Sequence, residues 1–175
     1  MKAYIIHHDQ STERKQIVQD LQKKTGAIIV NACWFPDHEK GCTLSHLKVA
    51  LHAKKNAPDE SYIVFEDDCE LLEDTKMIFS KFSAADVFYL GYNDVGRNEK
   101  GDKLIFGTHA LMISPKAREL LLNYEDIFSK PFDHALSELC TKEKLHVVYP
   151  EYDKREAYAR QKKDIISTIT GYPRK

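Results

Sequence analysis

The chain has 175 residues, 42% of them hydrophobic, and a formal charge of −1 from 26 basic and 27 acidic side chains. A chain of this length forms one domain that buries roughly two thirds of its unfolded surface. The balanced charge excludes a strong field toward nucleic acid or an anionic membrane, so we expect a small-molecule partner and no nucleic acid. No apolar run approaches the roughly 18 residues of a transmembrane segment, and the N-terminal run is too short for a signal peptide, so we expect a cytoplasmic protein.

The first half of the chain alternates predicted strands and helices. A strand over 2–7 precedes a helix whose cap is Ser11 or Thr12, because apolar residues recur at helical spacing behind them. A second strand over 26–32 leads into an irregular stretch over 33–41. The next helix covers 42–56, is closed by Pro58, and has a predicted apolar face of Leu44, Leu47, Ala50 and Leu51.

The second half continues the alternation. The predicted elements are a strand over 61–66, a helix over 74–83, a strand over 86–92, a loop over 93–102, an apolar stretch over 104–114, helices over 115–124 and 131–143, and a strand over 145–150. Strands that are apolar along their whole length indicate a mainly parallel sheet that is covered on both faces. The sequence therefore predicts an α/β fold with one domain over 1–150 and a basic tail over 151–175.

Three consecutive acids, Glu66, Asp67 and Asp68, follow the apolar strand over 61–66. Ligands of α/β sheets bind at the carboxyl ends of the strands, where these acids are expected. Continued strand geometry would point Glu66 and Asp68 to one side and Asp67 to the other, so that two carboxylates converge on a divalent cation such as Mn²⁺ or Mg²⁺. The alternative is that Asp67 or Asp68 caps a following helix.

Six stretches together resemble glycosyltransferase family 25, which includes lipopolysaccharide-biosynthesis and procollagen galactosyltransferases. In chain order they are "YIIHHDQSTER", "KGCTLSHLKVAL", "YIVFEDDCEL", "FGTHALMISPKARELLL", "KPFDH" and "YARQKKDIISTI". The resemblance implies a Rossmann-like A-type nucleotide-sugar transferase fold (GT-A). It also implies transfer of a hexose, galactose or glucose, from a nucleoside-diphosphate sugar with inversion at the anomeric carbon. The acceptor would be a hydroxyl of a glycan, a lipid-linked glycan or a protein.

The same resemblance implies roles for the acids and for a catalytic base. Glu66, Asp67 and Asp68 take the part of the family's D-x-D motif and hold the cation, Mn²⁺ or Mg²⁺, which neutralises the leaving diphosphate. Asp133 of "PFDH" is the candidate base for the acceptor hydroxyl, and His134 is a metal ligand or a substitute base. The alternative for Asp133 is a helix cap after Pro131.

Other candidate residues surround the expected donor site. The predicted donor-binding residues are Arg14, Gly41, Ser45, His46, Gly107, Thr108, His109, Gln161, Lys163 and Ser167. Each has a structural alternative: Arg14 pairs with an acid on its own helix, the 41–46 stretch is only a joint between loop and helix, and His109 is a buried strand residue. The basic tail over 151–175 is either a lid over the diphosphate or a solvated terminus.

Two further readings of the chain remain open. One is a catalytically degenerate protein on the same fold that binds a nucleotide sugar or a glycan without turnover. The other is a metal-dependent hydrolase that uses His7, His8, His46 or His109, although the sequence lacks the H-x-H and H-E-x-x-H patterns of such enzymes. The four cysteines form no C-x-x-C pair and are interpreted as reduced packing residues.

Overall fold

A computed structural model describes residues 1–72, 84–101, 103–150 and 158–161 of the chain. The predicted alternation is confirmed at the N-terminus, where the elements are β1 (Lys2–His7), a 3-10 turn η1 (Thr12–Arg14), α1 (Lys15–Thr25) and β2 (Ile28–Asn31). Helix α1 begins after this 3-10 turn, so the predicted caps Ser11 and Thr12 lie one turn upstream of it. It ends at Gly26, whose φ of 67° is the left-handed conformation that glycine adopts most readily.

Helix α2 (His38–Asn56) begins about one turn earlier than the sequence predicts. Asp37 caps it, because its side chain accepts hydrogen bonds from the backbone N–H groups of Glu39 and Lys40. The predicted apolar face is also wrong in part. Val49 and Ala53 are buried against the sheet, whereas Leu51 is 57% exposed.

The remaining elements confirm most of the predictions and correct one. They are β3 (Tyr62–Glu66), β4 (Cys69–Leu71), β5 (Val87–Tyr89), β6 (Asp94–Arg97), β7 (Lys103–Phe106), β8 (Ala110–Ile113), α4 (Pro115–Leu122), η2 (Glu125–Phe128), α5 (Phe132–Lys142), β9 (Val147–Val148) and β10 (Ala159–Gln161). The predicted loop over 93–102 is wrong, because β6 within it pairs with β7 as an antiparallel hairpin. The predicted helix over 74–83 lies outside the described residues.

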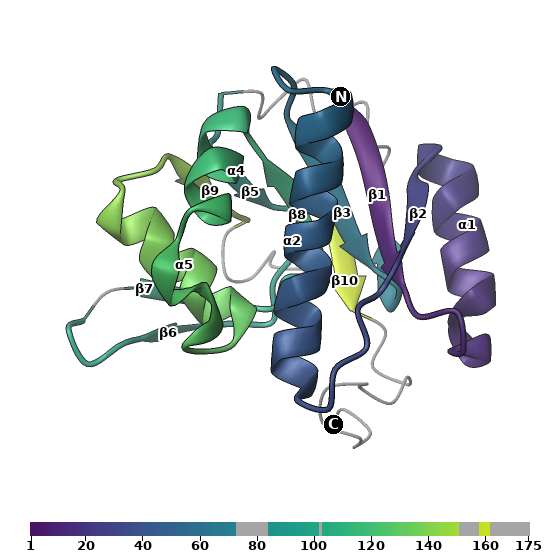
Figure 1. Cartoon of the computed structure of the whole chain (residues 1–175), viewed down its shortest axis with the longest axis horizontal. Coiled ribbons are helices and arrows are strands. Elements are labelled where there is room, and N and C mark those ends of the chain that lie inside the picture. The colour runs from purple at the N-terminus through teal and green to yellow at the C-terminus, as the bar shows by residue number, and fades with distance from the viewer. Residues whose placement is uncertain (73–83, 102, 151–157, 162–175) are drawn as a thin grey trace.

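Six strands form the central sheet in the order β2-β1-β3-β8-β5-β9 (Figure 1). Strand β8 is antiparallel to both of its neighbours, and the other pairings are parallel. Five strands therefore run in one direction. This confirms the predicted α/β fold, a mainly parallel mixed sheet of the Rossmann-like type with helices on its faces.

Both faces of the sheet are buried, which explains the continuous apolar runs. In β3, Tyr62 and Val64 belong to the core under α2, α4 and α5, whereas Ile63 and Phe65 belong to the core under α1 and β4. Adjacent residues of a strand point to opposite faces, so a strand covered on both sides has no polar face. In Figure 1, α2 crosses in front of the sheet.

The strand directions bring several loops to one edge of the sheet. The carboxyl ends of β1, β3 and β5 meet there with the amino end of β8, because β8 runs the opposite way. His7, Glu66, Asn93 and Thr108 lie at or next to these ends. This edge is where α/β sheets bind ligands.

Arg118 of α4 joins this helix to the loop after α2. Its side chain is 1% exposed, and its guanidinium donates to the backbone carbonyls of Ala57, Pro58 and Glu60. We expect Arg118→Met to lower the free energy of unfolding by about 3 kcal/mol, since three hydrogen bonds from a buried charged donor are lost. In a chain of this size that lowers the melting temperature by roughly 6–12 °C in calorimetry.

Lys116→Met on the same helix is the matched control for Arg118→Met. Lys116 is exposed and reaches Asp86 at 3.2 Å, so its loss should cost no more than about 1 kcal/mol. Equal effects of the two substitutions would contradict a special role for the buried guanidinium.

No helix among the described residues is both long enough and apolar enough to cross a membrane. The expected division at residue 150 stays a prediction, because 151–157 and 162–175 lie outside the described residues. Within the tail, Ala159–Gln161 form β10, which pairs antiparallel with β4.

Candidate functional site

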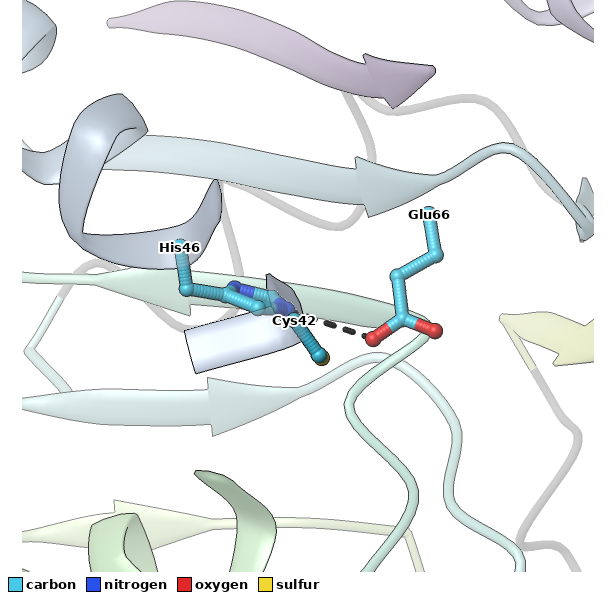
Figure 2. Close-up of side chains that lie close together, drawn as sticks. All are labelled: Cys42, His46 and Glu66. Carbon is cyan, nitrogen blue, oxygen red and sulfur yellow. Dashed lines mark hydrogen bonds and ion pairs between the residues drawn. The ribbon is translucent and has the colours of Figure 1, made fainter. Parts of the chain in front are cut away.

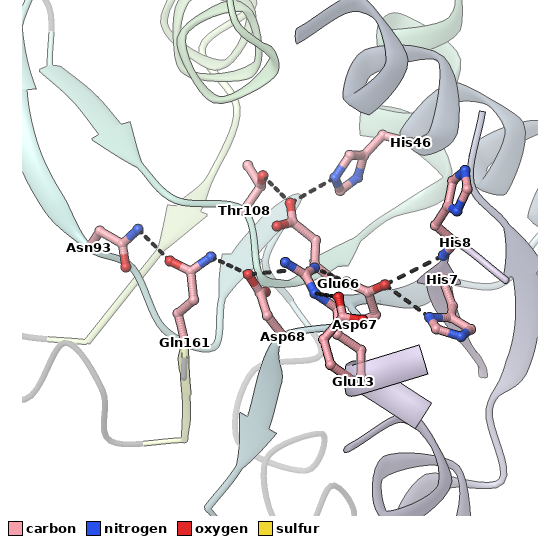
Figure 3. Close-up of polar contacts among 11 residues, drawn as sticks. His7, His8, Glu13, His46, Glu66, Asp67, Asp68, Asn93, Thr108 and Gln161 are labelled. Carbon is pink, nitrogen blue, oxygen red and sulfur yellow. Dashed lines mark hydrogen bonds and ion pairs between the residues drawn. The ribbon is translucent and has the colours of Figure 1, made fainter. Parts of the chain in front are cut away.

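The three acids lie where β3 ends, but they do not pair as the sequence predicts. Strand geometry stops at Glu66, and Asp67 and Asp68 occupy the turn into β4. Asp67 and Asp68 both approach Arg14. The Glu66 carboxylate instead contacts His46, as Figure 3 shows. The predicted continuation of strand geometry through Asp68 is therefore wrong, and the shared cation role of Glu66 and Asp68 stays a prediction. The alternative of a helix cap is also wrong, because a strand follows the acids.

Asp67 is held on both of its carboxylate oxygens. Nη1 of Arg14 donates to Oδ1, and Oδ2 bonds Nδ1 of His7 at 2.9 Å and the backbone N–H of His8 at 3.4 Å. Arg14 is 3% exposed and also lies 3.9 Å from Oδ2 of Asp68. Burial lowers the pKa of Arg14, but Asp67 and Asp68 outweigh it and raise that pKa above its ordinary value. Arg14 is thus a fixed buried cation.

Glu66 faces α2 and the β7–β8 connection. Its Oε1 accepts a hydrogen bond from Oγ1 of Thr108 at 2.8 Å and bonds Nε2 of His46 at 3.2 Å. Burial raises the pKa of Glu66, but the hydrogen bond and charge of His46, with the bond from Thr108, together hold that pKa at about 2. The His46 ring stacks on Phe132 of α5, with 4.1 Å between the ring centroids. Glu66 is therefore an oriented carboxylate that is ionised at neutral pH.

Asp68 contacts the C-terminal segment. Nε2 of Gln161 donates to Oδ2 of Asp68 at 2.8 Å, and Oε1 of Gln161 accepts from Nδ2 of Asn93 at 3.0 Å. Gly91 makes room for this segment, because a Cβ there would lie 2.0 Å from the carbonyl oxygen of Ala159. The close packing of β10 over Gly91 therefore brings Gln161 to the acids.

A first cleft of about 280 Å³ lies between the acids and the start of α2. Glu66, Asp67 and Asp68 line it together with Arg14, and the aromatic residues Trp34, Phe35 and His38 line it as well. Trp34 is 70% exposed. The cleft thus joins a charged wall to exposed aromatic surface.

A second cleft of about 190 Å³ lies on the other side of Glu66. Its lining includes Asp133, Gly107, Thr108 and Gln161. The Asp133 carboxylate accepts hydrogen bonds from the backbone N–H groups of Gly107 at 3.1 Å and His134 at 2.9 Å. Glu66 and Cys42 line both clefts, so they form part of the wall between them.

Several predicted donor-binding residues lie at these clefts. Gly41, Ser45, His46 and Arg14 line the first cleft. Ser45 also has a structural task, because its Oγ donates to the carbonyl of Gly41 and accepts from the backbone N–H of Cys33. Four residues predicted from the sequence therefore line this cleft, and in Ser45 the structural alternative holds as well.

Gly107 and Thr108 line the second cleft, whereas His109 and His134 line neither. His109 is 1% exposed, and the ring of His134 packs on Phe106 with 4.8 Å between centroids. Gly107 has a φ of 93°, and a Cβ there would lie 2.9 Å from the Asn93 side chain, so glycine is required. The predicted donor-binding residues Lys163 and Ser167 lie outside the described residues.

Cys42 is the site residue that the sequence analysis missed. Cys69 and Cys140 are buried as packing residues, but Cys42 and Cys33 are only half-buried and line the first cleft. The spacing of Cys42 and His46, one helical turn apart, was the available signal, because it places both side chains on one face of a helix.

The acid cluster has the chemistry that the divalent cation of an A-type fold requires. Glu66, Asp67 and Asp68 bring three carboxylates to the first cleft against the one guanidinium of Arg14, which leaves an excess of two negative charges among these four side chains. Asp67 accepts hydrogen bonds on both of its carboxylate oxygens and anchors Arg14. Glu66 and Asp68 line the first cleft with carboxylates, which are the ligand type that a hard cation prefers, so their chemistry fits such a cation.

Comparison with solved structures finds the same fold in other proteins. One is a glycosyltransferase involved in the glycosylation of the major capsid of PBCV-1, with a TM-score of 0.56 and 12% identity over 86% of this chain and 82% of that chain. Another is A197 from STIV, with a TM-score of 0.50 and 13% identity over 84% and 80% of the two chains. No protein-family model and no curated protein matches the sequence. The chain therefore has a glycosyltransferase-like fold, and membership of family 25 stays an expectation.

Proposed function

We propose that this protein is a metal-dependent inverting glycosyltransferase that moves a hexose, galactose or glucose, from a nucleoside-diphosphate sugar to a hydroxyl of a glycan, a lipid-linked glycan or a protein. The observation that carries the proposal is the pair of clefts that meet at Glu66. Group transfer between two substrates needs two binding sites with a common wall, and the carboxyl edge of the sheet offers both.

The first cleft suits the nucleotide part of the donor. Its volume of about 280 Å³ lies near the lower end of the range for small-molecule pockets, about 300–1,000 Å³. Exposed Trp34 and Phe35 offer aromatic ring faces on which the nucleobase of the donor can stack. Arg14 offers a positive charge toward a diphosphate, although its contacts with Asp67 hold it in place. In this proposal Arg14 helps to bind the donor and does not move during the reaction.

The second cleft suits the acceptor and the base. Inversion requires the acceptor hydroxyl to attack from the side opposite the leaving diphosphate, and Asp133 lines the cleft across Glu66 from the first. The backbone N–H groups of Gly107 and His134 donate hydrogen bonds to the Asp133 carboxylate and fix its orientation in the cleft. Asp133 is therefore our candidate to take the proton of the acceptor hydroxyl.

Glu66 and Asp68 would hold the cation, Mn²⁺ or Mg²⁺, which supplies Lewis-acid neutralisation of charge on the leaving diphosphate. Glu66 is oriented by Thr108 and Asp68 by Gln161. Gln161 therefore links the C-terminal segment to the proposed cation site, which supports the expectation that the tail acts at the donor.

A degenerate binding protein on the same fold is the second candidate. The internal partners of the acids favour it, because Arg14, His7 and Gln161 already satisfy much of the cluster without a cation. The two candidates differ in turnover. Donor binding without hydrolysis or transfer in the parent protein would favour the second.

Thermal shift with nucleoside-diphosphate sugars, with and without Mn²⁺, tests the proposed function. UDP-galactose or UDP-glucose at 100 times its Kd should stabilise the native state by about 2.7 kcal/mol. The increase should require Mn²⁺ and should vanish in Asp68→Ala. Glu70→Gln is the matched control, since Glu70 pairs instead with the exposed Arg160. Absence of any shift with every donor tested would overturn the donor assignment.

A further inference from the structure

Three ligand-bearing side chains of different chemistry meet at the wall between the clefts. Cys42 and His46 project from one face of α2 toward Glu66 at the end of β3 (Figure 2). One ligand atom from each lies within 4.8 Å of the others. The cluster is therefore compact enough to be compared with a metal centre.

The distances approach those of a tetrahedral ion. Bonds of about 2.0–2.3 Å to nitrogen, oxygen and sulfur place neighbouring ligand atoms about 3.3–3.7 Å apart. Nε2 of His46 and Oε1 of Glu66 are already 3.2 Å apart. Closing the cluster around an ion therefore requires the farthest ligand atoms, which are at most 4.8 Å apart, to approach by up to about 1.5 Å, which side-chain rotation supplies.

The ligand set selects a different class of ion from the acid cluster. Thiolate and imidazole favour Zn²⁺ and related borderline ions, whereas Mg²⁺ and Mn²⁺ prefer oxygen ligands. The site proposed above for a hard cation uses Glu66 and Asp68. The cluster with Cys42 and His46 lies on the α2 side of the same carboxylate.

The surrounding contacts fix the ligands. The His46 ring is held flat against Phe132, with an angle of 12° between the rings, and Thr108 holds Oε1 of Glu66. Cys42 and His46 lie on a 19-residue helix, so their spacing is rigid. A site whose ligands are oriented before binding loses little conformational freedom when the ion arrives.

The cluster supplies three protein ligands and is open toward the clefts. Cys42 and Glu66 line both clefts, and His46 lines the first. Three protein ligands with an open fourth position are typical of zinc sites that bind water or a small ligand, whereas structural zinc sites are closed by four. An ion there would be reachable from either cleft.

We propose that Cys42, His46 and Glu66 form a binding site for a Zn²⁺-class ion at the junction of the two clefts. Binding releases the thiol proton of Cys42 to solvent. It also takes the proton from Nε2 of His46, which passes through solvent so that the neutral ring carries its proton on Nδ1, and Nε2 of His46 and Oε1 of Glu66 then both bind the ion. Because Glu66 is shared, Zn²⁺ at its Oε1 leaves only Oε2 of that carboxylate for the hard cation. The inference itself needs no sugar transfer and stands independently of the proposed function.

Cobalt titration of the intact protein tests the site, because Co²⁺ bound to a thiolate gives a charge-transfer absorption that oxygen ligands do not give. We expect one equivalent of Co²⁺ to produce this band and Zn²⁺ to remove it. Cys42→Ser should abolish the band, and His46→Gln should weaken Co²⁺ binding at least about tenfold. Cys33→Ser is the matched control for metal binding, since Cys33 lines the first cleft but lies outside the cluster.

Alkylation of the parent protein tests the same site without any substitution, so its result does not depend on whether a variant folds. Zn²⁺ should slow the reaction of Cys42 with iodoacetamide at least about tenfold relative to Cys33, as read by peptide mass spectrometry. A band that persists in Cys42→Ser, or equal protection of both cysteines, would overturn the proposal. If no nucleoside-diphosphate sugar shifts the melting temperature but Zn²⁺ still protects Cys42, the proposed transferase function is wrong and the zinc site stands.

Discussion

Asp133→Asn is expected to lower the rate of sugar transfer about 10²–10⁴-fold while donor affinity is unchanged. Asparagine has nearly the same shape but cannot take a proton from the acceptor hydroxyl. Its carbonyl can still accept the hydrogen bond that Gly107 now donates at 3.1 Å. The fold should therefore survive with a loss of about 1 kcal/mol or less.

Single-turnover transfer and a donor thermal shift measured on the same preparation separate catalysis from binding. The matched control is Glu138→Gln, which makes the same change of carboxylate to amide on α5 at a residue that pairs with Lys130 and lines neither cleft. Parent and Glu138→Gln should transfer at similar rates. If Asp133→Asn also keeps the parent rate, Asp133 is an orienting residue of the cleft and another group is the base.

The sequence predicted the layers of the fold because the pattern of burial is local. Tyr62 to Phe65 are all buried, and such continuous apolar runs occur in strands covered on both faces. Pro115 at the first position of α4 and the Ser114 side chain that caps it are likewise signals contained within a few residues. Elements that depend on neighbours in sequence were therefore found.

The errors arise where hydrogen bonds outside the apolar pattern decide the structure. The stretch over 94–97 has a loop-like composition, but pairing with 103–106 makes it a strand. Helix α2 begins early because the side chain of Asp37 satisfies its first backbone donors, and an apolar pattern does not report such a cap. Composition and periodicity alone do not include hydrogen bonds that a cap or a neighbouring strand supplies.

The candidate site shows the same division. The acids were singled out by a local pattern, as a charged triplet at the end of a predicted strand, whereas Asp133, Arg14 and Gln161 were proposed through the family resemblance. The pairing of Arg14 and Gln161 with the acids was not predicted, because Arg14 reaches Asp67 across 53 residues and Gln161 reaches Asp68 across 93. Sequence spacing predicted how the acids would point along an ideal strand, whereas the buried guanidinium and the turn after Glu66 decide how they do.

The buried guanidinium of Arg14 is also expected to stabilise the fold. Arg14→Met should lower the free energy of unfolding by about 3–5 kcal/mol, because methionine fills similar volume but leaves Asp67 and Asp68 buried without their cation. The melting temperature should fall by roughly 6–20 °C in calorimetry without ligand. The matched control is Arg97→Met on the β6–β7 hairpin, whose exposed guanidinium donates to the carbonyl of Gly101 and should cost about 1 kcal/mol or less.

A double-mutant cycle with Asp67→Asn separates charge from packing. Asparagine removes the uncompensated charge, so Arg14→Met combined with Asp67→Asn should be more stable than the sum of the two single losses by at least about 2 kcal/mol. If the losses simply add within about 0.5 kcal/mol, the two side chains are not coupled and Arg14 stabilises the protein by packing alone. Coupling of the expected size would instead mean that Asp67 serves chiefly to hold Arg14 in place at the first cleft.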